Sequence, residues 1–482
     1  MNTNWLSVII LYGWFLTGLF IVKFLQKNKK TNPNQILLSL FAGPIIMVWI
    51  QLQENRDKIL QFFNPAKSDK EGEQVFLNLI FLDNHGRDLF ANRTGDSAII
   101  GYVKKMVYEA VSQRSSDIFI DPKEDFYTIR LRVDGMIRTY DTIPEEKALS
   151  VISMIKAASS MDIAEKRRPQ DGMFSVLYEG LNTSFRVATV GVFGGEKITI
   201  RVIATENSKR DLTDIGLSKE QLSLVRSGVK LPSGMILMCG PTGSGKTSTL
   251  YSLLGSIDYS IKNVISIEDP IERVIPHISQ MEVNVRAGIT FASLLRNALR
   301  QNPDVICVGE IRDEETAEVA AHAAQTGHLI IATLHSNDNI GTIIRLTDLG
   351  VPLRSIAASL HLIISQRLVR KLCPHCRIKA KLNPEQLDFC RKYGIPTDSL
   401  YTSAGCSKCD HTGFSGRQAV FEILTMTNEL RSIMESTESS VSAIQDYIEQ
   451  NQGNNTIFNI TGEMLLRGEI PLEEFERVNI DF

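Results

Sequence analysis

Two long uncharged runs of hydrophobic residues come first along this chain. Residues 5–22 carry no charge over 18 positions. At about 1.5 Å per residue, a helix of that length nearly crosses a hydrocarbon core of about 30 Å. Residues 36–52 form the second run, with Gly43-Pro44 in its middle. Residues 1–52 are therefore predicted to be a hydrophobic membrane-anchor region of membrane-associated helices, and buried core helices are the alternative for each run.

Four lysines separate the two runs, and no basic residue precedes the first, so neither run looks like a cleaved signal peptide. If the remainder of the chain is cytoplasmic, a hairpin of two spans would place these lysines outside, against the positive-inside tendency. A single span with its N-terminus outside, followed by a second run that lies in the interface or re-enters, avoids this conflict. A hairpin that breaks the tendency stays open as the alternative. Residues 53–95 are predicted to be a linker, because their first part is highly charged.

Shorter periodic patterns begin near residue 96 and predict a small α+β domain over residues 96–205. Apolar residues recur at helical spacing in residues 99–111, and a second helix is expected near 148–159. Asp134-Gly135 is typical of a hairpin turn. Alternating strands are expected at residues 118–120, 127–133 and 136–140, and on both sides of a Gly-Gly turn within 185–203.

An apolar strand, a glycine-rich loop and a helix follow one another in residues 235–254. The letters GPTGSGKT contain G-x-x-x-x-G-K-T in the context that a P-loop requires. The glycines let backbone N–H groups converge on phosphate oxygens at the positive end of the helix. Lys246 should reach the β- and γ-phosphates, and the Thr247 hydroxyl should bind Mg²⁺. The predicted ATP-binding residues are Gly240, Pro241, Thr242, Gly243, Ser244, Gly245, Lys246, Thr247 and Ser248.

Carboxylates stand at the ends of two further apolar strands. Glu310 follows the buried run 305–308, and it is the candidate to order the attacking water or a metal-bound water. Glu268 and Glu272 follow a second run, and a parallel α/β sheet would turn both strand ends toward the P-loop. His335 ends a third apolar run and is a candidate γ-phosphate sensor. A turn or capping role for each acid, and a structural role for the histidine, are the alternatives.

Four of the seven cysteines form two Cys-x-x-Cys pairs separated by 29 residues. That spacing suits a tetrahedral four-thiolate zinc site with no open ligand position, so the zinc is expected to be structural. An odd cysteine number in this arrangement indicates a reducing compartment rather than a disulfide framework. The predicted zinc ligands are Cys373, Cys376, Cys406 and Cys409, while Cys239, Cys307 and Cys390 are expected to be packing residues.

The charge of the chain argues against a nucleic-acid partner. Lysine and arginine number 52 against 55 acidic residues, which gives a net charge of −3. A protein that coats nucleic acid generally has a basic field. The hydrophobic fraction of 43% is enough for ordinary globular cores, and the length suggests roughly three domains.

Four sequence boxes stand in a fixed order: the P-loop, EDPIE at 268–272, GEIRD at 309–313 and TGHLIIATLHSN at 326–337. Together they resemble the secretion traffic ATPases of type II secretion and type IV pilus assembly, the GspE/PilB family. The resemblance runs from about residue 96 to the C-terminus. It implies an α/β fold in which the small α+β domain precedes a P-loop (RecA-like) ATPase core at 206–370, a four-cysteine zinc element at 371–412 and a C-terminal helical region at 413–482.

The resemblance also implies arginines that stabilise charge on the γ-phosphate. EKRRPQDGMF is similar to a family motif in which the α+β domain packs over the nucleotide, and Arg167 matches an arginine of that motif. Met173 stands where the family usually has arginine, and Phe119 replaces the usual histidine. Further arginines of the family pattern are Arg296 and Arg300, expected four apart on one helix face, and Arg312 of GEIRD; a salt bridge to a nearby acid is the alternative for each.

The function implied by the resemblance is ATP hydrolysis that drives pilin or pseudopilin polymerisation. The family forms homo-hexamers that act on a polytopic inner-membrane platform protein, with the ATPase domains on the cytoplasmic side of the bacterial inner membrane. A zinc element favours pilus extension or secretion over retraction. Two other functions stay open: a nucleic-acid motor, disfavoured by the charge, and a nucleotide-gated scaffold, disfavoured because Lys246 and Glu310 are present. A soluble protein without an anchor is the remaining alternative.

Overall fold

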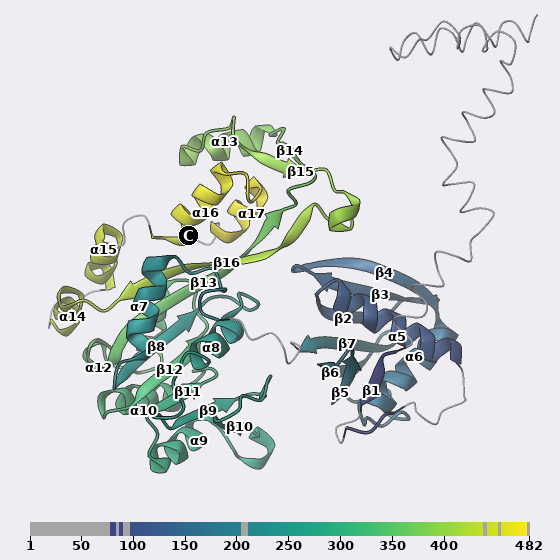
Figure 1. Ribbon diagram of the computed structural model, residues 1–482, viewed down its shortest axis with the longest axis horizontal. Helices are drawn as coiled ribbons and strands as arrows, with labels where there is room; N and C mark the ends of the chain where they lie inside the picture. The colour runs from purple at the N-terminus through teal and green to yellow at the C-terminus, as the bar shows by residue number, and fades with distance from the viewer. Residues whose placement is uncertain are drawn as a thin grey trace, which may run out of the picture. The chain divides into compact units, whose positions relative to one another are not determined.

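The computed structural model describes residues 78–82, 86–89, 97–203, 211–436, 441–451 and 455–479. The expected membrane-anchor region at 1–52 lies outside the described residues, as does most of the linker. Within the described ranges, none of the helices combines the length and the apolar character needed to span a bilayer. Two parts of the chain carry the fold, an α+β domain up to residue 203 and a P-loop domain from residue 211 (Figure 1), and each is considered separately.

The α+β domain consists of one antiparallel sheet and two helices, α5 (Ser97–Ser112) and α6 (Glu145–Ala158). Helix α6 packs against β3, β4 and β5. Asp134 and Gly135, with φ of 49° and 85°, form the predicted hairpin turn. In sheet order the strands are β1 (Ile80–Leu82), β5 (Gln170–Tyr178), β6 (Leu181–Val192), β7 (Gly195–Ile203), β2 (Ser115–Pro122), β3 (Phe126–Val133) and β4 (Met136–Pro144).

Strand β1 corrects the prediction that residues 53–95 are only a linker. Ile80 pairs with Leu177 of β5 through the backbone, so part of that segment belongs to the sheet. A strand of three residues shows no periodicity, and its partner lies almost a hundred positions away, so the sequence gives no local sign of it. The other expected helices and strands of this domain are confirmed, and β5 is an addition to them.

The P-loop domain is built on a second sheet whose central strands are parallel. Its order places the P-loop strand β8 between β12 and β13, and β13 pairs antiparallel with β16 at one edge. In sheet order the strands are β10 (Ser279–Glu282), β9 (Val264–Glu268), β11 (Val305–Val308), β12 (Leu329–Leu334), β8 (Gly234–Cys239), β13 (Leu360–Leu372) and β16 (Phe414–Thr425).

Two hydrophobic cores lie on opposite faces of this sheet, because successive side chains of a strand point to opposite sides. Met235 and Leu237 of β8 belong to the core that also contains residues of α9–α12, whereas Ile236 and Met238 belong to the core with α7 and α8. A parallel sheet covered by helices on both faces is what the continuous apolar strands predict. These helices are α7 (Lys219–Val229), α8 (Lys246–Leu254), α9 (Phe291–Ala298), α10 (Glu314–Gln325), α11 (Asn339–Asp348) and α12 (Leu353–Ser359).

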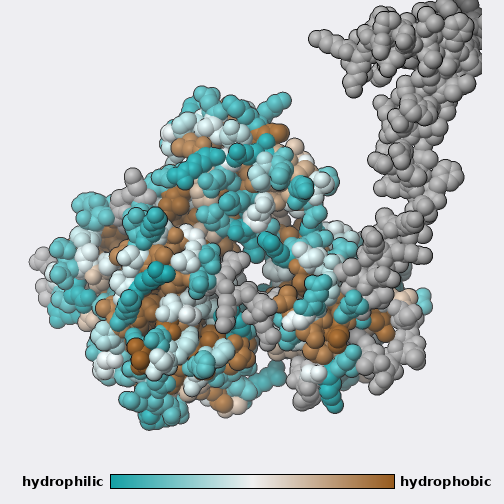
Figure 2. Space-filling model, viewed as in Figure 1, coloured by the Kyte–Doolittle hydropathy of each residue, from teal (hydrophilic) through white to brown (hydrophobic). Residues whose placement is uncertain are grey.

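The C-terminal segment contains both strand and helix. Strand β16 pairs along most of β13, so the prediction of a helical region from residue 413 is wrong at its start. The short elements between these strands are β14 (Arg377–Lys379), α13 (Pro384–Tyr393) and β15 (Tyr401–Ser403). After β16 follow α14 (Asn428–Glu435), α15 (Val441–Asn451), α16 (Ile457–Leu466) and α17 (Leu472–Asn479). On the visible face, hydrophobic residues are mixed with hydrophilic ones (Figure 2), as is usual for a protein surface.

Candidate nucleotide and metal sites

The glycine-rich loop between β8 and α8 is shaped as a phosphate cradle. Gly240, Gly243 and Gly245 have φ of 146°, 79° and 92°, a region that L side chains rarely adopt. A Cβ at Gly240 would lie 2.4 Å from the backbone oxygen of Gln366, so no larger residue fits there. Pro241, Thr242 and Gly243 are exposed at the rim. The loop thus offers its backbone N–H groups and the start of α8 to an anion, as a P-loop requires.

Lys246 begins α8 and is largely buried beside the loop. Its Nζ donates to the backbone oxygens of Gly240, at 2.6 Å, and Pro241, at 3.2 Å. Burial lowers the pKa of Lys246, while the charge of Glu310 acts in the opposite direction. Two buried polar atoms of this region, Ser244 Oγ and Gln366 Oε1, have no hydrogen-bond partner within the described ranges. The residues present therefore fit a bound triphosphate, with Thr247 half-buried at the first turn for Mg²⁺.

Three of the predicted side chains meet at the end of β11. The Glu310 carboxylate lies 2.8 Å from His335 Nε2 and 2.6 Å from Arg312 Nε. Arg312 also contacts Asp269 at 3.2 Å. Burial and the charge of Lys246 lower the pKa of His335, while the charge of Glu310 acts in the opposite direction. Gly309, which stands just before this acid, is closely packed, since a Cβ would lie 3.1 Å from the Ile267 oxygen.

Glu268 lies at the end of β9 and is buried among hydrogen-bond donors. Tyr251 Oη donates to Glu268 Oε2 at 2.5 Å, Ser266 Oγ donates to Oε1 at 2.7 Å, and Gln280 Nε2 donates to Oε1 at 2.9 Å. Burial raises the pKa of Tyr251, and the hydrogen bond to Glu268 raises it further, so the phenol stays a donor. Glu272, the other acid predicted here, has an exposed side chain.

The sequence reasoning missed Tyr251. The available sign was its position four residues after Thr247, which places both on one face of α8.

The arginines predicted on one helix face differ in their local structure. Arg296 lies on α9 and its NH1 is 2.5 Å from Glu315 Oε1, which is the salt-bridge alternative. Arg300 follows in a 3₁₀ turn (Leu299–Gln301), where its NH1 donates to the Arg296 backbone oxygen at 3.0 Å. The two arginines are thus neighbours on one helical segment, which tightens from α to 3₁₀ after Ala298 and ends at Asn302, whose φ is 50°.

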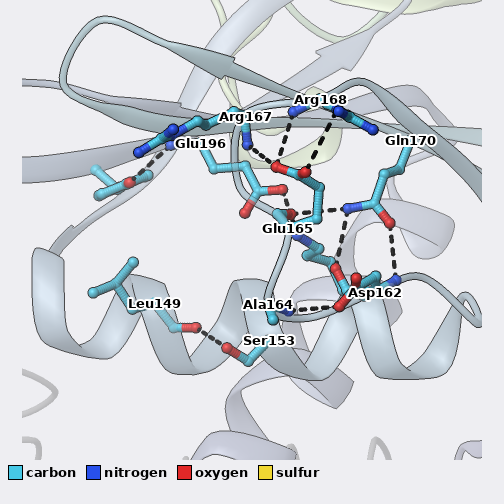
Figure 3. Close-up of polar contacts among 11 residues, drawn as sticks. Leu149, Ser153, Asp162, Ala164, Glu165, Arg167, Arg168, Gln170 and Glu196 are labelled. Carbon is cyan, nitrogen blue, oxygen red and sulfur yellow. Dashed lines mark hydrogen bonds and ion pairs between the residues drawn. The ribbon is translucent and has the colours of Figure 1, made fainter.

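Arg167 belongs to the α+β domain, in the loop between α6 and β5 (Figure 3). Its side chain is exposed, and no carboxylate in the described ranges forms an ion pair with it. Met173 is a partly exposed residue of β5. Phe119, at the histidine position of the family motif, lies under the guanidinium groups of Arg130 and Arg132, at 5.8 and 5.4 Å from the ring centre.

The four cysteines of the two Cys-x-x-Cys pairs come together at the end of β13. Their Sγ atoms all lie within 4.8 Å of one another. The Sγ distances are 3.9 Å for Cys373–Cys406, 3.8 Å for Cys376–Cys409 and 3.7 Å for Cys406–Cys409. Four thiolates around a tetrahedral Zn²⁺ with bonds of about 2.3 Å would be roughly 3.8 Å apart. The donor set and its spacing therefore fit zinc. The other three cysteines are buried, in agreement with a packing role.

Comparisons with known proteins cover most of the chain. The family model for type II/IV secretion system protein matches residues 92–477. The chain is 39% identical to the protein transport protein HofB homolog of Escherichia coli K12 over 384 residues, 78% of this chain and 80% of the relative. It is 40% identical to type II secretion system protein E of Klebsiella pneumoniae, over 73% of this chain and 70% of the relative. It is 39% identical to the type IV pilus assembly ATPase PilB of Thermus thermophilus, over 79% of this chain, but it spans only 43% of that relative.

Solved structures share the fold. The pilus retraction motor PilT with bound ADP aligns with a TM-score of 0.53 at 26% identity, covering 78% of this chain and 96% of that one. The Legionella pneumophila ATPase DotB aligns with a TM-score of 0.59 at 21% identity, covering 79% and 96%. The latter identity supports the fold alone.

Proposed function

Because this chain belongs to the type II/IV secretion system protein family, we propose that it hydrolyses ATP as the motor of a type IV pilus assembly or type II secretion system. The observation that carries the proposal is the P-loop at the end of β8, two strands away from the Glu310 carboxylate at the end of β11. In a parallel sheet these strand ends face the same side, where ligands bind. The names of the E. coli, Klebsiella and Thermus relatives support protein transport, secretion or pilus assembly as the setting.

The predicted residues at the ends of β8, β11 and β12 have distinct roles in this chemistry. The loop N–H groups and Lys246 would bind the phosphate oxygens, and Glu310 would accept a hydrogen bond from the attacking water and direct it at the γ-phosphorus. The bond to the β–γ bridging oxygen breaks, and ADP leaves with that oxygen. His335 and Arg312 hold Glu310 from two sides, which fixes the direction of its carboxylate. When bound at Thr247, Mg²⁺ would neutralise charge on the β- and γ-oxygens.

Several parts of the proposal rest on the family and on the fit of the residues. We infer a homo-hexamer that acts on a polytopic inner-membrane platform protein and a pilin or pseudopilin system, without a nucleic-acid partner. The domain boundaries at 96–205, 206–370, 371–412 and 413–482, and a location at the bacterial inner membrane with the ATPase on the cytoplasmic side, belong to the same proposal. The cysteine cluster is proposed to hold a structural Zn²⁺, because its geometry fits one.

The test is the ATPase rate of the full-length chain and of its Glu310→Gln variant, both purified in mild detergent. Loss of the carboxylate charge should lower kcat by about 100-fold or more, while ADP binding and the assembly mass stay unchanged. Glu318→Gln, which alters an exposed acid on α10, is the matched control. An unchanged rate in Glu310→Gln would refute the assignment. A well-folded assembly that binds ATP but does not hydrolyse it would instead support a nucleotide-gated scaffold.

A further inference from the structure

Buried polar side chains extend from the P-loop strand to the elements beside it. Cys239, the last residue of β8, has its Sγ 2.9 Å from Ser365 Oγ of β13 and 3.6 Å from the backbone oxygen of Asp338. Ser365 Oγ donates in turn to Asn339 Oδ1 at 2.6 Å. Cys239, Ser365 and Asn339 are at most 1% exposed. The strand that leads into the P-loop is therefore joined by hydrogen bonds to the start of α11.

Asn339 and Glu422 form the centre of this group of side chains. Asn339 Nδ2 donates to Glu422 Oε1 of β16 at 2.9 Å, and Glu422 Oε2 accepts the backbone N–H of Ile457, the first residue of α16, at 2.9 Å. Glu422 is 6% exposed and is paired in register with Ser365. Because both carboxylate oxygens accept, the Asn339 amide places its nitrogen toward Glu422 and its oxygen toward the Ser365 hydroxyl. Each of these hydrogen bonds therefore has a fixed direction.

The turn between β12 and α11 carries His335 at its start and leads into Asn339. It consists of residues 335–338. At one end of the turn, His335 Nε2 lies 2.8 Å from Glu310 Oε1. At the other end, the Asp338 side chain caps α11, a contact within the start of that helix. The Asn339 amide instead binds residues of β13 and β16, so it fixes the turn relative to the sheet.

These contacts contribute order rather than a large net stability. Burying a carboxylate with an amide costs desolvation that a hydrophobic pair avoids. When one partner is changed, however, the other is left buried without its hydrogen bond. A buried network of hydrogen bonds also rigidifies the backbones that it joins. Here those backbones are the end of β8, the turn that carries His335, and the strands β13 and β16.

We propose that Asn339 and Glu422 are positioning residues: paired with each other, they hold the turn that places His335 against Glu310 during ATP hydrolysis. The inference rests on the proposed ATPase function and adds two residues that act through His335. It requires no contact of Asn339 or Glu422 with the nucleotide. A role in stability alone is the alternative, and the rate of the folded protein distinguishes the two.

An exchange of the two side-chain functions tests the pair. Asn339→Asp sets two carboxylates against each other, and Glu422→Gln sets an amide nitrogen against either Asn339 Nδ2 or the Ile457 N–H. The double variant Asn339→Asp with Glu422→Gln matches donors to acceptors again. Its carboxylate accepts from Ser365 Oγ and from the new amide, whose oxygen accepts the Ile457 N–H. The double variant also has the net charge of wild type.

Thermal denaturation of the full-length chain in mild detergent is the first measurement. Each single variant should lower Tm by about 4–8 °C, because a buried polar group loses its partner. The double variant should recover about half of that loss or more. Asn479→Asp is the matched control, because it also places a carboxylate at a buried amide, whose Nδ2 donates to Thr461 Oγ1 and to the backbone oxygen of Phe475. Additive losses in the double variant would refute the pairing.

The second measurement is kcat at a temperature well below every Tm. Asn339→Asp and Glu422→Gln should each lower kcat by about tenfold through misplacement of His335. The double variant should return to within about threefold of wild type. Asn479→Asp should lose stability without losing rate. Wild-type rates in both single variants would leave only a structural role and would overturn the proposal.

The route through His335 is tested in a His335→Gln background. There Asn339→Asp should cause no further loss of kcat, because the side chain that it positions is already changed. An equal loss in both backgrounds would show that Asn339 acts by another route, such as through Cys239 and the P-loop, and would overturn the proposal. A wild-type rate in His335→Gln would overturn it too, and sensitivity to Glu310→Gln would then leave the proposed ATPase function standing.

Discussion

The hydroxyl of Tyr251 should contribute measurably to the stability of the P-loop domain. Tyr251→Phe keeps the ring, which is 8% exposed, and deletes only the oxygen that donates to Glu268 at 2.5 Å. No cavity larger than the hydroxyl arises, so the packing contribution is preserved. The Glu268 carboxylate, itself 5% exposed, keeps its bonds from Ser266 and Gln280 on one oxygen and loses the protein donor on the other.

The magnitude follows from the charge and burial of this acceptor. A hydrogen bond to a charged group contributes about 1.5–3 kcal/mol, because a buried carboxylate oxygen left without a donor loses its solvation as well. The backbone N–H of Arg273, which donates to the same hydroxyl at 3.2 Å, loses its acceptor too. We therefore expect the free energy of unfolding to fall by about 2 kcal/mol. At 2–4 °C per kcal/mol for a domain of this size, Tm should fall by roughly 4–8 °C.

Differential scanning calorimetry of the full-length chain is the assay, and Tyr259→Phe is the matched control. Tyr259 donates its hydroxyl at 2.5 Å to the backbone oxygen of Leu254, a neutral acceptor, so its loss should cost about half as much. The double variant Tyr251→Phe with Glu268→Gln should show non-additive losses, because both changes remove one contact. A Tm shift in Tyr251→Phe no larger than in Tyr259→Phe, with additive losses, would refute the reasoning.

Three other predictions concern separate parts of the molecule. Glu474 is 0% exposed, and although burial raises its pKa, hydrogen bonds from Arg477 and Arg370 hold that pKa below 4.5. Glu474→Gln should therefore lower the free energy of unfolding by about 3–5 kcal/mol at pH 7. In thermal denaturation, the difference from wild type should shrink as the pH falls below 4.5, because the wild-type carboxylate then becomes protonated. Cys406→Ser should abolish the roughly one zinc per chain expected by atomic absorption, whereas a zinc content equal to wild type would contradict the four-thiolate site. Burial lowers the pKa of His335, so its neutral form should persist below pH 6.5. In a pH profile of kcat, the decrease on the acid side should lie below pH 6.5 and be absent in His335→Gln. A decrease that begins above about pH 7 would refute the assignment of this step to His335.

The elements that the sequence predicts well are those whose cause is local. The P-loop requires a strand, glycines at positive φ and a helix start within about fifteen residues, and all three lie where the letters predict. The parallel strands are equally visible, because each is a short continuous apolar run between polar turns. By contrast, β1 exists only through its backbone pairing with β5, and β16 through its pairing with β13, so their cause lies far away in the sequence.

Side-chain contacts in the candidate site that depend on distant parts of the sequence could not be predicted either. Glu310, Arg312 and His335 are each singled out by motif letters, and their mutual contacts follow from their places just after strands of one sheet. Motif letters do not show that Tyr251 and Gln280 enclose Glu268, because those contacts depend on how α8 and β10 pack. The hydrogen bonds of Gln170 to the backbone oxygens of Asp162 and Glu165, in the loop between α6 and β5, cannot be predicted either, because a glutamine in a sequence does not indicate which backbone groups it will contact.

The charged groups of the two regions differ in whether they already have partners. Lys246 is bonded to carbonyls of its own loop, and Glu310 is held between His335 and Arg312. A triphosphate that binds Lys246 must replace the hydrogen bonds that Lys246 donates to these carbonyls. The binding free energy gained is therefore only the difference between a hydrogen bond to a charged phosphate and one to a neutral carbonyl. Arg167 has no ion pair to give up in the described residues, and its backbone is fixed. A contact that it makes costs the desolvation of an exposed guanidinium and the rotamer freedom of its side chain, because the hydrogen bond to Glu165 orders only the backbone.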